Sequence, residues 1–545
     1  MPFPFKPARA LLPALFLLLA AGPCAAGFFP NDPNNPPKAD DPLVRAPKPD
    51  EGTVAVSMTT NLAAILELTG FRVRRIGAPG KGKPPQPDDK NETYTLTPVA
   101  PELAFDSALF IGVLPAGDYQ MAEVTLMPYD VTTYSGTDGT DFVTRTYQPV
   151  LAIPNVERYG TFTVSPGQTV DLGRTVLTPL NKITIFGRSG LNTDNRLLFE
   201  RRSPGHARLL GTGAVPGWNA PRGADDVAEA LALRRPVGTG CFSEYPDGRI
   251  AAAAKMGSVL LRSVDGAWTT VHAKGIDSLA CVLPVALPDA TLIGVGEANT
   301  IVKLAPGAST LSLVDPGNLP IGNLVYVAGN ESAGWYVASH NRERLTVFHA
   351  QKIDGGNWTQ MISLPLQKNF WWGQSGFWPW RTAKGFGFAL HDSLHLLDYA
   401  SGQWVTRKMP HETNVAAAQA SPNGAIGVRG KMMGGAYLSK DEGLSWKEVP
   451  TPARAWVPLQ LSNGDLYVSS TASAGYAEAG PILHSSSDGG AKWIQIGQFP
   501  GGKLEILPSG AMLSHGTARG YYTIRRSGDN GVSWTMEYNN HLRQR

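Results

Sequence analysis

The stretch Ser439-Lys440-Asp441-Glu442-Gly443-Leu444-Ser445-Trp446 decides the fold of this 545-residue chain, because its pattern returns twice. The two further copies of Ser-x-Asp-x-Gly-x-x-Trp occupy residues 486–493 and 527–534. In each copy the Asp carboxylate can accept backbone N–H bonds across a tight hairpin turn, and the Gly suits a position with positive φ. The Trp then begins the next strand. Trp446, Trp493 and Trp534 stand 47 and 41 residues apart, which predicts a repeated unit of four strands.

A second periodic mark extends the repeat toward the N-terminus. Short turns rich in Pro, Asn, Asp or Gly recur at 246–248, 288–290, 332–334, 383–385, 422–424, 463–464 and 508–510. Incomplete copies of the motif lie at 263–268, 354–358 and 398–404. Seven units in residues 237–545, of about 44 residues each, have the size of propeller blades. We therefore predict an all-β chain ending in a seven-bladed β-propeller, or a six-bladed one if the second unit, which has no Trp, is not a full blade.

The repeated motif resembles the Asp-box (BNR) repeat of sialidases, sortilin-type receptors, xyloglucan hydrolases and the photosystem II assembly-factor family. This resemblance covers the C-terminal half and implies a fold more than a function, since these families share the box but not an activity. It implies that each box closes the turn between the third and outermost strands of a blade, on the face away from the usual ligand site. The box residues are therefore expected to be structural: Ser439, Asp441, Gly443, Trp446, Ser486, Asp488, Gly490, Trp493, Ser527, Asp529, Gly531 and Trp534.

The same resemblance sets a test for enzymatic activity. The sialidase pattern includes Arg-Ile-Pro near the first blade, and the nearest match here, Arg249-Ile250-Ala251, lacks the Pro. Without it, no sialidase catalytic residue carries over. No pair of acids stands out for glycoside hydrolysis, and the sequence lacks serine-nucleophile elbows, phosphate-binding glycine loops and His-Glu-x-x-His. We predict no catalytic residues, no metal site and no cofactor.

The first residues predict export. Lys6 and Arg9 precede an apolar run over 11–21 and small residues up to Gly27, so residues 1–27 read as a secretory signal peptide. A lipid anchor at Cys24 is disfavoured because Pro23 stands where lipoprotein signals carry a small residue. Residues 28–51 are rich in Pro and Asp and read as a linker. The predicted location is periplasmic, extracellular or on the outer surface of a bacterial-type envelope.

Between the linker and the propeller we expect two segments. Residues 52–187 contain about seven short strands with turn residues between them, which predicts a β-sandwich. The stretch Leu114-Pro115-Ala116-Gly117-Asp118-Tyr119, followed by a strand, resembles the transthyretin-like and peptidase-regulatory-like sandwiches of secreted bacterial proteins. Residues 188–236 read as a connector, with a short helix expected over 225–233.

Charge and cysteine content narrow the function. Removing Lys6 and Arg9 takes two positive charges from the formal net charge of +3, and such a near-neutral chain argues against a nucleic-acid binder. Cys241 and Cys281 remain after the signal. They precede corresponding blade turns by similar distances, so a disulfide between adjacent inner strands is one reading, and two buried free thiols are the other.

The aromatic stretch 370–381 is the main candidate for binding. Four of the 13 Trp fall there, between the third blade and the fourth inner strand, where the spacing between turns lengthens. Arg454, Trp456 and Tyr476 are expected on the same face. Flat rings beside Arg suit a sugar or a protein segment, although aromatic side chains also pack between blades. The candidates are Trp371, Trp372, Trp378, Trp380, Arg381, Arg454, Trp456 and Tyr476.

Together these patterns favour an exported, non-enzymatic binding or scaffold protein. Its propeller face is expected to bind a protein or glycan partner in envelope assembly, adhesion or complex maturation, with no nucleic acid and no membrane span. The alternative is a carbohydrate-active enzyme, glycoside hydrolase or sialidase-like, that uses an aromatic groove on the propeller.

Overall fold

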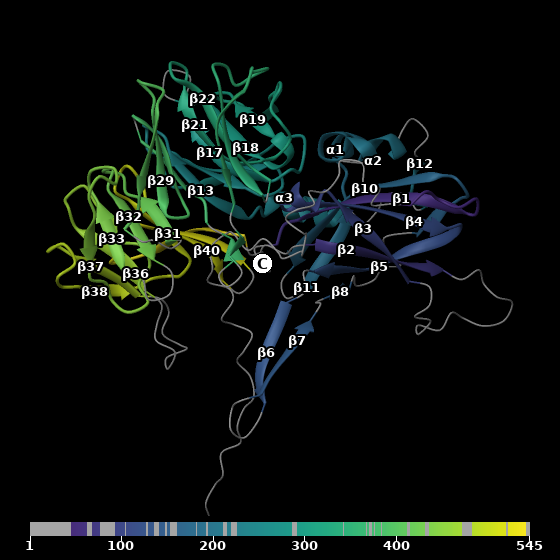
Figure 1. Cartoon of the computed structure of the whole chain (residues 1–545), viewed down its shortest axis with the longest axis horizontal. Helices are drawn as coiled ribbons and strands as arrows, with labels where there is room; N and C mark the ends of the chain where they lie inside the picture. Colours follow the sequence, from purple (N-terminus) through teal and green to yellow (C-terminus); the bar gives the residue numbers. More distant parts are fainter. Residues whose placement is uncertain are drawn as a thin grey trace, which may run out of the picture.

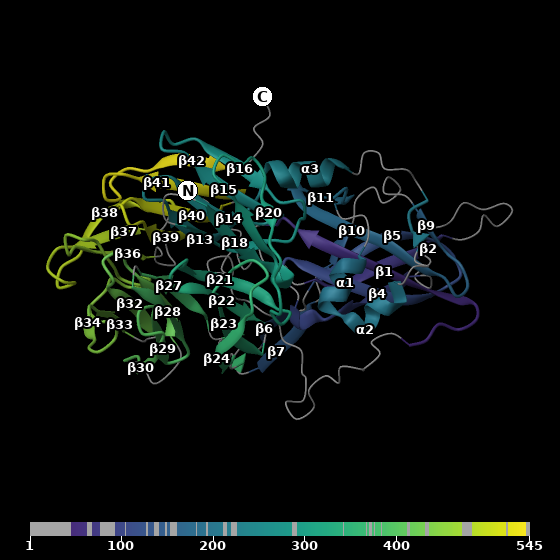
Figure 2. The ribbon, with the colours of Figure 1, turned by 90° about the horizontal axis from the view of Figure 1, so that it is seen from above.

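The chain forms a propeller and an N-terminal β-domain that lie against each other (Figure 1). In Figure 2 the teal-to-yellow blades form one half of the molecule, and the purple and blue strands form the other. The computed structural model describes residues 45–540 apart from these gaps: 63–67, 77–92, 104, 127–128, 136–140, 148–149, 153–160, 181–182, 192–194, 211–214, 220–225, 286–290, 342, 367, 370–372, 375, 383, 411–414, 431–434, 471–481 and 519–520. The predicted signal peptide, Cys24 and most of the predicted linker lie outside the described residues.

The propeller has seven blades, as the spacing of the turns predicts. Each blade is a four-stranded antiparallel sheet built from consecutive strands, and each short turn noted in the sequence joins a first strand to a second. Blades 1 to 4 are β13(Gly238–Glu244), β14(Ile250–Ala254), β15(Ser258–Arg262), β16(Trp268–His272); β17(Leu279–Pro284), β18(Leu292–Gly296), β19(Ile301–Leu304), β20(Ser312–Leu313); β21(Asn323–Asn330), β22(Gly334–His340), β23(Arg344–Ala350), β24(Thr359–Pro365); and β27(Trp378–Arg381), β28(Gly385–Leu390), β29(Ser393–Asp398), β30(Trp404–Lys408). Blades 5 to 7 are β31(Val415–Ala420), β32(Ile426–Gly430), β33(Ala436–Ser439), β34(Lys447–Val449); β35(Leu459–Gln460), β36(Leu466–Ser470), β37(Ile482–Ser486), β38(Ile494–Gln498); and β39(Lys503–Ile506), β40(Met512–Ala518), β41(Tyr521–Ser527), β42(Thr535–Asn539).

Burial falls from the middle of each blade to its outer edge. The second strand is covered on both faces by neighbouring blades, so β14 and β28 are buried along their whole length. The outer strand is more exposed, and no residue of β30 is fully buried. The second blade, whose sequence lacks a Trp, still has all four strands, although its outer strand β20 is only two residues long. It is therefore a full blade, and the six-bladed alternative is wrong.

The N-terminal domain is a ten-stranded sheet that folds over its own core. Along the path β11-β10-β1-β4-β3-β2-β5-β8, with β9 and β12 at its sides, strand β3 belongs to both halves: its first residues pair with β2 and its last with β4. The two sheets expected from the sequence are thus continuous through β3. The strands are β1(Glu51–Thr60), β2(Leu68–Ile76), β3(Thr93–Val99), β4(Ser107–Pro115), β5(Gly117–Leu126), β8(Val150–Ala152), β9(Thr161–Val164), β10(Thr169–Leu180), β11(Ile183–Arg188) and β12(Val215–Pro216). A separate hairpin, β6(Tyr129–Ser135) with β7(Asp141–Tyr147), projects from the domain in Figure 1.

Strand β1 is buried on both faces, and this positions the two domains. One face contributes Val54, Val56 and Met58 to the core between the two halves of the sheet. The opposite face carries Ala55 into a second cluster with Leu198 and Phe199 of the connector and Ala298 of the propeller. The N-terminal sheet therefore packs onto the connector and the ring rather than standing alone.

The connector is more structured than the sequence suggests. It contains α1(Arg196–Arg202), α2(Pro204–Ala207), a 3-10 turn (Arg208–Leu210) and α3(Asp226–Arg234), the last of which lies where a short helix is predicted. Ala232 of α3 packs with Val176 of β10 and Met256 and Ile276 of the first blade. Among the described residues, no helix is both long and apolar enough to cross a membrane.

Candidate functional site

The three complete Ser-x-Asp-x-Gly-x-x-Trp motifs form turns between the third and fourth strands of blades 5, 6 and 7. In the first, Asp441 Oδ1 accepts hydrogen bonds from Ser439 Oγ and from the backbone N–H of Ser445, at 2.8 and 2.9 Å. Gly443 has φ of 86°, and a Cβ there would come within 2.6 Å of Leu394 in the neighbouring blade. The bonds from Ser445 and Ser439 lower the pKa of Asp441 to about 2. The same contacts recur at Ser486, Asp488 and Gly490 and at Ser527, Asp529 and Gly531.

The tryptophans of these motifs pack against blades and bond locally. Trp446 lies against the cluster between blades 4 and 5, and Trp493 Nε1 donates to Pro450 O at 2.6 Å. Trp534 stacks edge-on against Phe499 of the preceding blade. The Ser hydroxyl and one Asp oxygen of each motif are thus bonded within their own turn. Trp446 Nε1 has no hydrogen-bond partner among the described residues, so this Trp contributes by packing.

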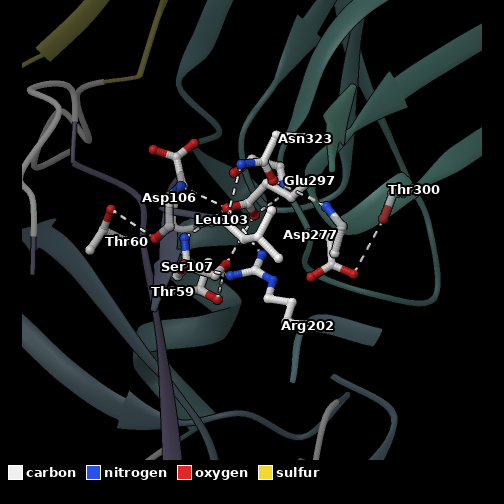
Figure 3. Close-up of polar contacts among 12 residues, drawn as sticks. Thr59, Thr60, Leu103, Asp106, Ser107, Arg202, Asp277, Glu297, Thr300 and Asn323 are labelled. Carbon is white, nitrogen blue, oxygen red and sulfur yellow. Dashed lines mark hydrogen bonds and ion pairs between the residues drawn. The ribbon is translucent and has the colours of Figure 1, made fainter. Parts of the chain in front are cut away.

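On the opposite side of the ring, the N-terminal domain covers the loops of the first blades. These loops join second to third strands, and each outer strand to the next inner strand. They include Lys255, Asp277, the 3-10 turn Glu297–Asn299, and Asn323. Lys255 Nζ lies 2.5 Å from Asp106 Oδ1. Asn323 Nδ2 donates to Leu103 O at 2.9 Å (Figure 3). The loop side of blades 1 to 3 is therefore partly occupied by the protein itself.

Arg381 crosses the centre of the ring. From the end of the fourth inner strand, its guanidinium donates to Val282 O of blade 2 at 3.0 Å and to Val327 O of blade 3 at 3.2 Å. It also donates to Ser243 Oγ of blade 1 and lies over the ring of Tyr326, 5.2 Å from its centroid. One side chain thus ties four inner strands together, which is a structural role for a residue that the sequence presents as a ligand contact.

A second polar group connects the inner strands of blades 5 and 7. Glu505 of blade 7 accepts a hydrogen bond from Gln419 Nε2 of blade 5 at 2.8 Å and pairs with Lys503 Nζ at 2.5 Å. Burial acts to raise the pKa of Glu505, but Lys503 and His515 lower it to about 2. A carboxyl group with this pKa stays ionised near neutral pH and is a poor general acid. The sequence analysis missed this group; its signal was two charged residues on an inner strand, where apolar residues dominate.

The structure separates the predicted aromatic candidates. Trp380 is 7% exposed and belongs to the core between blades 4 and 5, and Trp378 packs against the same cluster. Trp456 is half-buried, and Arg454 is exposed with φ of 58°. Trp371, Trp372 and Tyr476 lie outside the described residues. The sequence left two readings for these residues, binding or packing between blades. For Trp378 and Trp380 the structure shows packing.

Cys241 and Cys281 form a disulfide between the inner strands of blades 1 and 2. Their Cα atoms lie 5.0 Å apart, which is within the normal range for a disulfide. Of the two readings left open by the sequence, the structure has the bonded one. Within the described parts of the chain, no three His, Cys, Asp or Glu side chains gather closely enough to hold a metal ion.

Comparison with known proteins identifies no family for this chain. No protein-family model matches the sequence, and no curated protein matches it. Among solved structures, the virginiamycin B lyase from Staphylococcus aureus with quinupristin is 13% identical over 55% of this chain and 92% of that chain, with a TM-score of 0.36. A streptogramin B lyase is 12% identical over 56% of this chain and 94% of that chain, with a TM-score of 0.38. YCF48 from Cyanidioschyzon merolae is 12% identical over 51% of this chain and 92% of that chain, with a TM-score of 0.39. These likenesses identify no substrate and no partner.

One buried histidine in the aromatic core gives a pH prediction. His395 stacks on Phe388, with 4.9 Å between ring centroids, and its Nδ1 lies 3.2 Å from Thr406 Oγ1. Burial lowers the pKa of His395 to about 4 from 6.5. The folded protein then binds fewer protons than the unfolded chain between these values, so this contribution to stability is complete above pH 6.5 and is lost as the pH falls to about 4.

We expect His395→Asn to flatten this pH dependence without abolishing folding. Urea unfolding of both proteins at several pH values between 7 and 4 measures it, and the difference in stability between them should shrink toward pH 4. A residual slope is expected in the variant, because burial also lowers the pKa of His272 and His484. A difference that is constant over this range would contradict the prediction.

Proposed function

We propose that this protein is an exported, non-enzymatic scaffold that binds a protein partner on the loop side of the propeller, the side opposite the Asp-box turns. The carrying observation is a small hairpin between blades 3 and 4, in which Lys368 pairs with Gln374 and Asn369 with Gly373. The residues that join these two strands in the sequence are Phe370, Trp371 and Trp372. Three consecutive aromatic residues between two short strands have the composition of a binding hot spot.

The positions of the other loops favour the same part of the ring as the binding site. The N-terminal domain bonds to Lys255, Glu297 and Asn323 of blades 1 to 3, so those loops are already engaged. The remaining candidates Arg454, Trp456 and Tyr476 belong to the connection before blade 6 and to a loop within it. A partner that contacts both the aromatic hairpin and blade 6 would therefore sit over blades 4 to 6.

Two observations favour binding over catalysis. Two charged side chains on the inner strands are already paired. Arg381 bonds to backbone carbonyls, and Glu505 bonds to Lys503 and Gln419. The low pKa of Glu505 also removes it as the general acid that glycoside hydrolysis requires. A carbohydrate-active enzyme remains the alternative that the experiment must be able to reveal.

The test compares wild-type protein with Trp371→Ala/Trp372→Ala in pulldowns from the native envelope and on glycan arrays. We expect the double variant to bind the captured protein at least about tenfold more weakly, as for a hot-spot residue. Leu444→Ala is the matched control, because Leu444 is a 72% exposed apolar residue on the box side. Loss of a glycan signal instead would replace the protein partner with a glycan, and turnover of any glycoside by the purified protein would overturn the proposal.

A further inference from the structure

One buried carboxylate of the propeller lies at its contact with the N-terminal domain. Glu297 lies in the turn between β18 and β19 of blade 2 and is fully buried. Its Oε1 accepts from the backbone N–H groups of Asp106 and Ser107, at 2.6 and 2.8 Å. Its Oε2 accepts from Ser107 Oγ at 3.0 Å and from the N–H of Ser278 at 2.9 Å. Three of these four donors belong to the N-terminal domain.

The connector adds a cation to this site. The Arg202 side chain, at the end of α1, is 1% exposed, and its Nη2 lies 3.7 Å from Glu297 Oε1. Its Nη1 donates to Ser107 O at 2.8 Å, which fixes the guanidinium beside the same two residues (Figure 3). Nε and Nη2 have no hydrogen-bond partner among the described residues. The guanidinium therefore has an unused donor, Nη2, beside the carboxylate.

The surrounding charges balance only when Glu297 is ionised. Lys255 pairs with Asp106 at 2.5 Å, and Arg174 pairs with Asp277 at 2.8 Å, so each of these acids has its own cation. Arg202 pairs with Glu297, its nearest carboxylate. Burial raises the pKa of Glu297 above its usual range, with Asp106 and Asp277 acting in the same direction and Arg202 acting against it. The four hydrogen-bond donors on its two oxygens favour the charged form. Without the carboxylate, a buried site with convergent donors would hold an uncompensated positive charge.

We propose that the N-terminal domain and connector carry a carboxylate-binding site, formed by the N–H groups of Asp106 and Ser107, the Ser107 hydroxyl and Arg202, which Glu297 occupies in cis. Adjacent backbone N–H groups with a hydroxyl and a guanidinium are the chemistry that captures carboxylates in other settings. When the two domains dock, the N-terminal domain and connector bind the Glu297 carboxylate of the propeller. When the Glu297 side chain is removed, the site takes a small free carboxylate in its place.

The test is chemical rescue in the full-length chain. Thermal unfolding of Glu297→Ala is followed in increasing sodium acetate, with sodium chloride holding the ionic strength constant. We expect a saturable rise in the midpoint of about 2 °C or more, because a ligand that binds only the folded state stabilises it. Wild-type protein and Glu442→Ala, which removes an exposed glutamate, should show no such rise.

Two comparisons decide whether the site recognises a carboxylate. Acetamide has the shape of acetate without its charge, and chloride has the charge without the shape. The proposal is overturned if either raises the midpoint of Glu297→Ala as much as acetate does, or if acetate raises it no more than in Glu442→Ala.

A second variant covers the case in which Glu297→Ala does not fold. Glu297→Gln keeps the shape of the side chain but places an NH₂ group against donors. We expect hydrogen exchange at the amides of Asp106 and Ser107 to become at least about tenfold faster than in wild type, since each loses a charge-assisted acceptor. Unchanged protection of these two amides would overturn the proposal. Neither readout requires the envelope partner, so its outcome is separate from that of the proposed function.

Discussion

Arg202→Leu will lower the free energy of unfolding by about 3–5 kcal/mol, the cost of removing one member of a buried ion pair. The variant leaves Glu297 buried beside Asp106 and Asp277, with one cation fewer for three acids. Arg201→Leu, one residue earlier on the same helix, is the matched control. Arg201 is half-buried, and we expect its replacement to cost less than about 1 kcal/mol. Urea unfolding followed by circular dichroism measures both.

A double variant separates charge from packing. In Arg202→Leu/Glu297→Leu neither charge remains, so the loss should be smaller than in Arg202→Leu alone. Limited proteolysis of the connector provides a second readout, since weaker docking should speed cleavage there. Equal losses in Arg202→Leu and Arg201→Leu, or a double variant that loses as much stability as Arg202→Leu alone, would contradict this account of the interface.

Arg262→Met will destabilise the ring where it closes. Blade 7 and blade 1 are each built from consecutive strands, so no strand is exchanged across their junction. Arg262 of β15 instead holds Glu537 of β42 through two bonds of 2.7 and 2.8 Å, and Trp268 Nε1 donates to the same carboxylate at 3.2 Å. Both charged side chains are about one-tenth exposed. We expect a loss of about 3 kcal/mol, because Glu537 is left without its cation.

The chain contains a matched pair on its surface. Arg249 and Asp247 lie 2.8 Å apart in the same blade, and their side chains are 40% and 42% exposed. Arg249→Met should therefore cost no more than about 1 kcal/mol. Hydrogen exchange locates the effect: in Arg262→Met, exchange should accelerate in blades 1 and 7 and stay unchanged in blade 4. Uniform acceleration around the ring would show that the pair does not act at the closure.

The blades could be predicted because their signals are local. A turn such as Pro246-Asp247-Gly248 or a box such as 439–446 uses residues within a few positions of each other, and the regular spacing then counts the sheets. The position of the N-terminal domain has no such signal. Glu297 and Ser107 are 190 residues apart, and a glutamate in a turn has the same sequence signature whether water or another domain surrounds it.

For a related reason, the sequence could not distinguish residues that bind a ligand from residues that pack between blades. Trp378 and Trp380 alternate along a strand, and that pattern fits a groove as well as a core. Only the neighbouring blade, which supplies Val415, Ala418 and Val428, decides that Trp380 packs inside. Arg381 is similar, since its partners Val282 and Val327 are backbone carbonyls whose positions depend on the closed ring.

Seven repeated blades alone would offer seven equivalent docking positions. The N-terminal domain makes them unequal, because it covers the loops of some blades and not of others. Its contacts with Lys255, Glu297 and Asn323 involve the loops of blades 1 to 3. The loop side of the ring is therefore asymmetric. A molecule that binds the loops of the other blades meets a surface that occurs only once around the propeller axis. For the proposed partner we therefore expect a single orientation and a one-to-one complex.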